Sequence, residues 1–413
     1  MDRKLRICYF AEQTIHTWRW LDHFTALGHE VFIFTGFASG FRKWPIPLPE
    51  RTGPNLDQAP RSVPVSVPRS ISRLRPIYSV LRPIYSRAMR MLEKPRELHG
   101  MARQLRHHVA AVAPDIVHAL WLWDNALYAH AAGFHPYVVT PWGSDIWKID
   151  YFRKGKSRRL RQALDSADAV TAGVQALLDG CQQWGARTSR CHLIAAPGID
   201  IAHFEKPTAD LLPALHELQK KGTIIFCPRS MAPLYHLDKV VQAFGQLLKT
   251  RPQCHLLLLD AHAAPGYRDE VLRLISQLAL GAHVTILDRV PYEQMPHLYA
   301  LSAVVVSLAE CDAIPQSGYE ALAAGRPLIV SDLPQYDGVL DHEQTVLRVP
   351  WHDPAAVARA LLRVLEDSAL RQRLATNGRN LARDRGDMRR EMGKLEALFF
   401  QLAPIPADLN HAA

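Results

Sequence analysis

Cysteine is scarce in this sequence and occurs only at isolated positions. The cysteines are Cys8, Cys181, Cys191, Cys227, Cys254 and Cys311. No two of them have the spacing of a zinc-ligand pair, and their isolation provides no disulfide framework. A reducing compartment, the cytoplasm, is therefore the expected location.

Long hydrophobic runs are also missing. The longest, such as AVVVSLA at 303–309, are too short to cross a bilayer as a helix. The first residues, MDRKLRICYF, lead directly into a strand-like run and do not have the pattern of a signal peptide. We therefore expect neither secretion nor a membrane-spanning helix.

Two ligand motifs are absent as well. The first strand-like run continues as AEQTIHT and not as the glycine fingerprint GxGxxG, so this half gives no direct sign of a dinucleotide. There is no DxD motif and no cluster of metal ligands in the sequence. We expect no metal and no cofactor.

The chain has 413 residues, of which 48% are hydrophobic and 22% are charged, a composition typical of soluble globular proteins. That length favours two domains. Short buried runs alternate with amphipathic stretches in both halves, which predicts α/β domains with doubly wound parallel sheets. We expect a first domain over 1–200, a second over 201–385, and a closing helix and tail over 386–413.

The net charge of +9 is concentrated in one segment. A Pro- and Arg-rich insertion is expected over 38–106, and residues 61–106 contain eleven Lys or Arg against two Glu. This segment is interpreted either as a solvated helix packed on its own domain or as a surface for anionic lipid head groups. Nucleic acid is not expected as a partner, because no recognisable nucleic-acid module is present.

The stretch from Asp312 to Asp332 contains two acids close to a predicted sheet edge. Asp312 lies in a loop, and Glu320 follows eight positions later on a helix expected over 319–324. Gly325 ends that helix, and a buried strand follows. Strand, loop and helix start in this order place a ligand at the carboxyl edge of a parallel sheet. A solvated surface loop is the alternative interpretation.

A set of phrases extends this pattern along most of the chain. In order they are PDIVH, TPWGSD, SADAVTAG, APGID, the Arg229 loop, VSLAECDAIPQSGYEALAAGRPLIVSD and DPAAVARALLRVLED. The set resembles the retaining nucleotide-sugar glycosyltransferases of family 4, whose central motif is an acid, seven residues and then Glu. Asp312 and Glu320 match that motif. The resemblance implies the GT-B fold: two Rossmann-like domains across a crevice, with a C-terminal helix closing back on the first.

The resemblance also implies roles on the donor side. Glu320 would accept hydrogen bonds from the ribose hydroxyls, and Asp312 would meet hydroxyls of the sugar. Arg229 would bind the diphosphate and offset the charge of the departing nucleotide. The implied catalytic residues are Arg229, Asp312 and Asp145. The implied donor-binding residues are Glu320, Ile314, Pro315, Gln316, Ser317, Gly318, Tyr235 and Arg289, with the amides of 314–318 at a helix start that suits anions.

The first domain would supply the acceptor side. Trp142 stands where relatives often have a histidine, and its ring can stack on a sugar or simply pack. Asp145 matches the acid of the same segment and is expected to face the crevice. His16 and Trp18 are the other acceptor-side candidates.

One departure from the family concerns the charge near the diphosphate. The lysine usual about five residues after Arg229 is replaced by MAPLYHL, so Tyr235 or His236 would donate a hydrogen bond in its place.

The implied reaction moves a sugar from a nucleoside diphosphate to an acceptor hydroxyl, with retained configuration and no metal. The acceptor class would be a surface polysaccharide, a lipopolysaccharide or a lipid-linked glycan, with the enzyme in the cytoplasm or peripheral on the inner face of the membrane. The alternatives are a nucleotide-sugar epimerase or hydrolase on the same fold, and a degenerate, non-catalytic transferase that serves as a binding scaffold.

Overall fold

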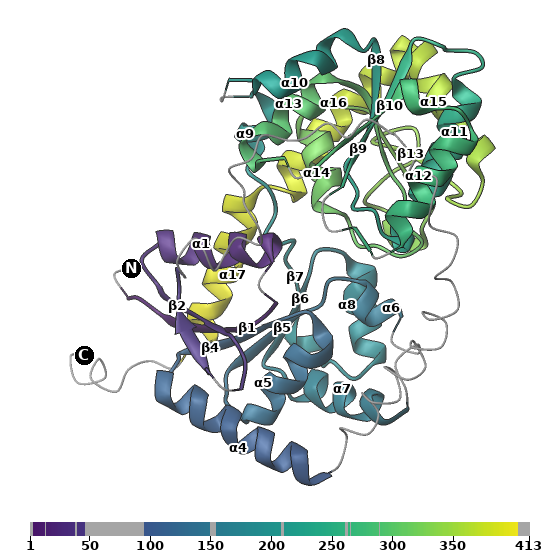
Figure 1. The fold of residues 1–413 in the computed structure, drawn as a ribbon. Helices are drawn as coiled ribbons and strands as arrows, with labels where there is room; N and C mark the ends of the chain where they lie inside the picture. The colour runs from purple at the N-terminus through teal and green to yellow at the C-terminus, as the bar shows by residue number, and fades with distance from the viewer. Residues whose placement is uncertain are drawn as a thin grey trace.

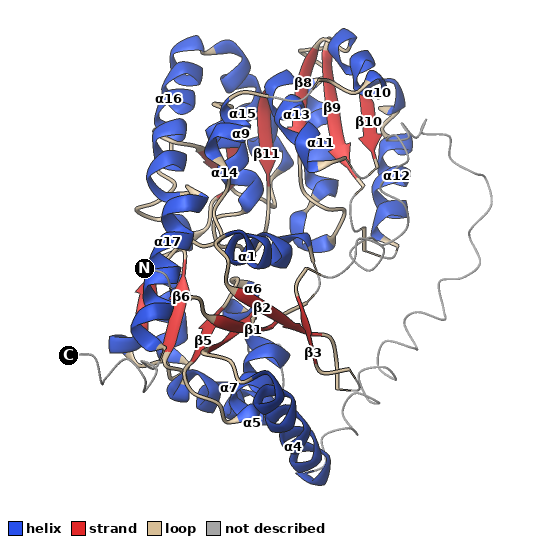
Figure 2. Cartoon of the chain, turned by 90° about the vertical axis from the view of Figure 1, so that its left-hand side faces the viewer, coloured by secondary structure: helices blue, strands red, loops and turns tan. Residues whose placement is uncertain are grey.

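The structure is a computed structural model that describes residues 3–12, 14–37, 39–45, 95–148, 154–207, 210–260, 263–264, 266–288 and 290–403. It has two lobes, each built on one sheet with helices on both faces (Figure 1). Helix α1 lies between the two sheets (Figure 2). None of the helices in these ranges is long and apolar enough to cross a membrane.

The first sheet has seven strands in the order β3-β2-β1-β4-β5-β6-β7, parallel except for β3, which pairs antiparallel with β2. Its strands are β1 (Arg6–Phe10), β2 (Glu30–Phe34), β3 (Phe41–Lys43), β4 (Ile116–Leu120), β5 (Tyr137–Thr140), β6 (Ala169–Ala172) and β7 (Cys191–Leu193). Its helices are α1 (Ile15–Ala26), α4 (Pro95–Val112), α5 (Leu127–Ala132), α6 (Ser144–Trp147), α7 (Lys154–Ser166) and α8 (Gln175–Gln183).

The second sheet has six parallel strands in the order β10-β9-β8-β11-β12-β13. Its strands are β8 (Thr223–Cys227), β9 (Cys254–Leu259), β10 (Val284–Leu287), β11 (Ser302–Ser307), β12 (Leu328–Ser331) and β13 (Leu347–Val349). Its helices are α9 (Ile201–Glu205), α10 (Pro213–His216), α11 (Leu237–Leu247), α12 (Tyr267–Gln277), α13 (Met295–Leu301), α14 (Gln316–Ala323), α15 (Pro354–Glu366) and α16 (Ser368–Arg385). The predicted fold class is confirmed.

Successive residues of each central strand pack on opposite faces, as the pleat of a strand requires. In β1, Ile7 and Tyr9 belong to the core on one face, whereas Cys8 and Phe10 belong to the core on the other. Because both faces are covered, the strands are continuously apolar, which is what made them visible in the sequence. The predicted insertion over 38–106 contributes β3 and α4, and most of its basic residues lie outside the described ranges.

The last helix, α17 (Met388–Leu402), packs on the first sheet, as the family resemblance implied (Figure 1). Its buried side chains include Leu395 and Phe399, and the ring of Phe399 stacks on that of Phe24 with centroids 5.3 Å apart. The chain therefore crosses between the lobes twice, once before α9 and once before α17.

The two crossings run side by side and are hydrogen bonded to each other. The amide of Ile199 donates to the carbonyl of Gly386 over 2.7 Å, and the amide of Met388 donates to the carbonyl of Ile199 over 2.9 Å. These crossings lie close to residues 200 and 385, and the domain boundaries expected there from the sequence stay a prediction.

Gly198 is required where the crossings meet, and replacing it with alanine should destabilise the protein. Its φ is +69°, and a Cβ there would lie 2.5 Å from the carbonyl oxygen of Gly386. We expect Gly198→Ala to lower the free energy of unfolding by about 1–3 kcal/mol, measured by urea denaturation. Gly393→Ala is the matched control, because a Cβ at Gly393 meets nothing within 4 Å and alanine favours a helix. Equal stability of the two variants would contradict this account.

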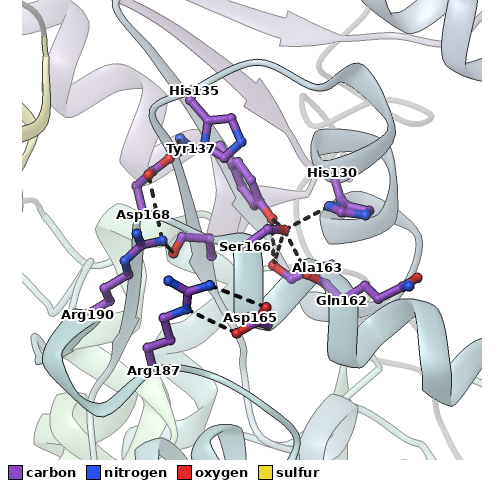
Figure 3. Close-up of polar contacts among 11 residues, drawn as sticks. His130, His135, Tyr137, Gln162, Ala163, Asp165, Ser166, Asp168, Arg187 and Arg190 are labelled. Carbon is purple, nitrogen blue, oxygen red and sulfur yellow. Dashed lines mark hydrogen bonds and ion pairs between the residues drawn. The ribbon is translucent and has the colours of Figure 1, made fainter.

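A polar network fastens α5 and α7 to the first sheet (Figure 3). Ser166 accepts or donates hydrogen bonds with His130 over 2.8 Å and with Tyr137 over 2.5 Å. Asp168 accepts from the amide of Tyr137 over 2.9 Å and pairs with His135. These residues do not line the cavity between the lobes, so we assign them a structural role.

Candidate active site

A cavity of about 510 Å³ lies between the two lobes. Most of its lining comes from segments that directly follow strands, so it lies at the carboxyl edges of both sheets, where α/β folds bind ligands. The first lobe contributes, among others, Glu12, Trp20, Trp121, Trp142 and Ser144. The second contributes, among others, Arg229, Tyr235, Asp312, Ile314, Pro315, Gln316, Ser317 and Glu320.

Arg229 and Asp312 form an ion pair at the edge of the second sheet. Arg229 follows β8, Asp312 follows β11, and Nη2 of Arg229 donates to Oδ2 of Asp312. The guanidinium also lies 3.8 Å from the ring centroid of Tyr235, a cation–π geometry. Burial raises the pKa of Asp312, and the charge of Arg229 partly opposes that rise. The sequence assigned these two residues to different parts of the donor, whereas the structure brings them into direct contact.

Glu320 is nearly buried on α14 and is contacted from both lobes. Its Oε2 accepts from the hydroxyl of Tyr299 over 2.9 Å, and its Oε1 pairs with Nη2 of Arg19 over 3.2 Å. Arg19 belongs to α1 of the first lobe and also reaches Gln316 over 3.3 Å. Sequence reasoning missed Arg19 and Tyr299, although the position of Arg19 on the polar side of an amphipathic helix was a weak signal.

Helix α14 begins at Gln316, three residues before the predicted start. The early start places Gln316, Ser317 and Gly318 in its first turn, where N–H groups lack partners within the helix. The amide of Gly318 already donates to the carbonyl of Pro315 over 2.9 Å. A Cβ at Gly318 would meet Pro315 Cγ at 3.1 Å, so a glycine suits this turn.

Asp145 does not face the crevice, and that prediction is wrong. Its side chain is fully buried and is not part of the cavity lining. Its carboxylate accepts from the backbone amides of Gly143 over 2.8 Å, Leu122 over 2.7 Å and Trp142 over 3.0 Å. The turn at Gly143 directs the amides of Trp142 and Gly143 toward the carboxylate of Asp145. Asp145 therefore positions the loop that carries Trp142.

The burial of Asp145 should give it a pH-dependent effect on stability. Burial raises the pKa of Asp145 to about 6, and the backbone amides oppose the rise. The contribution of Asp145 to the free energy of unfolding is therefore fully present below about pH 4, near the ordinary pKa of an Asp. It is lost as the pH rises through 6.

Asp145→Asn should accordingly destabilise the protein most at acidic pH. The amide group of Asn would meet the N–H of Leu122 with a second donor, at a cost of about 1–3 kcal/mol. In urea denaturation we expect the free energies of unfolding of the variant and the natural protein to differ more at pH 5 than at pH 7.5. The nucleotide affinity should be the same in the two proteins. Full stability with abolished turnover would restore the predicted catalytic role.

Three tryptophans form a stacked group on the first lobe. The ring centroids of Trp121 and Trp142 lie 6.4 Å apart with a 15° angle between the ring planes, and those of Trp121 and Trp123 lie 4.8 Å apart with a 29° angle. Trp121 and Trp142 line the cavity. Trp18, predicted on the acceptor side, packs against the core and does not line it, whereas Trp20 does.

For two further predicted residues the structure describes no side chain. Nothing is described for Arg289, and only the backbone of His16 is described, within α1. An acid that was not predicted, Glu12, follows β1 and lines the cavity. Burial and the neighbouring charge of Asp124 raise the pKa of Glu12. In the described ranges no three His, Cys, Asp or Glu gather as metal ligands would.

Comparison with protein families matches the two halves separately. Residues 13–197 match the model of the glycosyl transferase 4-like domain, and residues 210–381 match the model of glycosyl transferases group 1. A D-inositol 3-phosphate glycosyltransferase of Corynebacterium efficiens is 24% identical over 245 residues, 56% of this chain and 56% of that protein. A protein of the same description from Nocardioides is 24% identical over 237 residues. The chain thus matches about half the length of these curated relatives.

Solved structures agree in fold over almost the whole chain. Sucrose-phosphate synthase of Thermosynechococcus elongatus has a TM-score of 0.70 at 19% identity, over 97% of this chain and 99% of that one. HepE of Anabaena, crystallised with UDP and glucose, has a TM-score of 0.66 at 16% identity, over 96% and 100% of the two chains. Both halves match models of glycosyltransferase domains, the fold is that of GT-B enzymes, and the chain therefore belongs to family 4 of the glycosyltransferases.

Proposed function

We propose that this chain transfers a sugar from a nucleoside-diphosphate sugar to an acceptor hydroxyl, with retention of the anomeric configuration. One observation carries the proposal: Arg229, Asp312 and Glu320 line a single cavity at the edge of the second sheet, opposite the first lobe. HepE in complex with UDP-glucose, a structure of the same fold, supports a uridine nucleotide as the first donor to try.

Each residue of the donor side would then have a defined task. Glu320 would accept from the ribose hydroxyls, and the amides at the start of α14 would hold the sugar or the diphosphate. Arg229 would exchange its contact with Asp312 for a diphosphate oxygen, which would free the carboxylate of Asp312 for a hydroxyl of the sugar. Tyr235, under the guanidinium, would keep Arg229 in place during this exchange.

Leaving-group stabilisation would provide most of the catalysis. As the bond from the anomeric carbon to the diphosphate oxygen breaks, Arg229 and the α14 amides would meet the charge that develops on that oxygen. The acceptor oxygen would bond to the anomeric carbon on the same face, and its proton would pass to the departing phosphate. No metal is assigned to this step, and we expect turnover to persist in EDTA.

Incubation with nucleotide sugars tests the proposal. Release of nucleotide that depends on an acceptor is expected, with the product's anomeric configuration read by NMR. Turnover without an acceptor would favour an epimerase or a hydrolase. Failure of every nucleotide to raise the melting temperature would leave only a non-catalytic scaffold.

We also propose a cytoplasmic protein that lies peripherally on the inner face of the membrane, held by the basic residues of 61–106, with a glycan or lipid-linked acceptor. Arginines 69–90 are the residues to neutralise. Their replacement should reduce binding to liposomes that contain anionic lipid without altering turnover on a soluble acceptor. Undiminished liposome binding would refute the membrane contact.

A further inference from the structure

The wall of the cavity on the first lobe is aromatic. Trp20, Trp121 and Trp142 reach it from three separate segments: α1, the end of β4 and the end of β5. The rings of Trp121 and Trp142 are almost parallel, at 15°. Flat aromatic faces of this kind suit the C–H face of a sugar ring, because they bury it while leaving its hydroxyls in the plane free for hydrogen bonds.

The backbone holds Trp121 in an unusual conformation. Its φ is +70°, in a region that side-chain-bearing residues rarely occupy, and it directly precedes the π-helical turn Leu122–Ala126. Both features concentrate at functional sites, since they cost free energy that the rest of the fold must offset. The amide of Trp121 donates to the carbonyl of Thr140 over 2.9 Å, which fixes the loop beside the segment that carries Trp142.

The polar groups on this wall do not suit an anion. Among the described residues that line it, Glu12 is the one charged side chain, and the charge of Asp124 lies near it. The cation in the cavity lining, Arg229, belongs to the opposite wall and pairs with Asp312. A phosphate carries about −1.5 to −2 charges at neutral pH and would meet repulsion here.

Trp20 borders the same wall but is 1% exposed, and its Nε1 is enclosed by the protein. It therefore contributes apolar surface to the wall and not an accessible donor.

We infer that the first lobe binds the uncharged pyranose end of a glycan acceptor, stacked on Trp121 and Trp142, with a hydroxyl donating to Glu12. The inference rests on the proposed function and names its acceptor class. It separates this chain from a transferase that acts on a phosphorylated polyol, which the names of the curated relatives describe for those proteins.

Binding of defined sugars to the full chain, with UDP present, tests the inference. Saturation-transfer NMR with methyl glucoside, galactoside and mannoside should detect at least one neutral pyranoside. Glucose 6-phosphate and inositol 3-phosphate should bind at least tenfold more weakly than that pyranoside. Trp121→Ala and Trp142→Ala should each weaken pyranoside binding at least tenfold, Trp121→Phe should weaken it less, and Glu12→Gln should reduce the discrimination against phosphate.

Trp18→Phe is the matched control, because Trp18 shares α1 with Trp20 but does not line the cavity. It should leave pyranoside binding unchanged. The affinity for UDP, measured in each variant, reports that the protein is folded and the donor side intact. If the natural protein binds UDP, three results would overturn the inference: tighter binding of a phosphorylated probe, no bound pyranoside, or unaltered pyranoside binding in Trp121→Ala. Failure of the natural protein to bind any nucleotide would instead contradict the proposed function.

Discussion

Arg229→Ala should lower turnover by about 10²- to 10³-fold while weakening nucleotide binding much less. The guanidinium lies at the edge of the second sheet, where the diphosphate would gain charge as the sugar departs. Removing one preorganised donor to such a charge typically costs turnover of that size, because the contact strengthens in the transition state. Turnover is measured with a donor and an acceptor, and affinity by calorimetry with UDP. Equal losses in turnover and affinity would argue against a transition-state role.

The ion pair with Asp312 requires a control for this experiment. Arg229→Ala leaves the partly buried carboxylate of Asp312 without its cation, which would disturb the site independently of catalysis. The double variant Arg229→Ala, Asp312→Asn removes that unpaired charge. If the double variant regained most of the turnover, the loss in the single variant would reflect the orphaned acid and not the missing cation. Arg229→Lys should retain part of the turnover, since a point charge replaces the planar fork.

Glu320→Ala should weaken nucleotide binding by about 100-fold. A carboxylate that accepts from two ribose hydroxyls makes hydrogen bonds worth about 1.5–3 kcal/mol each, and part of that is recovered when water enters. We expect the UDP affinity of Glu320→Gln to lie between those of the natural protein and Glu320→Ala, because the side-chain amide of Gln retains one acceptor oxygen. Calorimetry with UDP measures all three proteins, and an unchanged dissociation constant would remove Glu320 from the nucleoside site.

Arg19→Ala separates binding of the nucleotide from the contact between lobes. This variant retains Glu320 and its bond from Tyr299 but removes the partner that reaches across from α1. We expect its nucleotide affinity to change much less than that of Glu320→Ala. Equal losses in the two would mean that Glu320 acts by holding the lobes together and not by contacting ribose.

The parallel sheets could be predicted because a strand covered on both faces is apolar without interruption. β8, β9 and β11 are of this kind, because every residue of β9 and all but one residue of β8 and of β11 are buried. The three-residue strands β3 and β13 have no such pattern and were missed. They gain their structure from pairing with a neighbour and not from their own residues.

The site was predictable as a set of positions but not as a set of contacts. Arg19 and Glu320 are 301 residues apart, and no local pattern reports their pairing. Asp145 was misplaced because an acid in a Pro- and Gly-containing loop is typical of an exposed ligand contact. Only the fold of the Gly143 turn, with a φ of +123°, shows that backbone amides enclose it.

The paired crossings at Ile199 and Met388 determine the mechanics of the cavity. Two separate tethers would let the lobes shear, twist and tilt independently, whereas two strands bonded to each other act as one pivot. We expect the lobes to open by rotation about that pivot, with little sliding of one lobe past the other. Such a rotation would lengthen the distance between Arg19 and Glu320, and spectroscopic labels placed across the crevice would follow it.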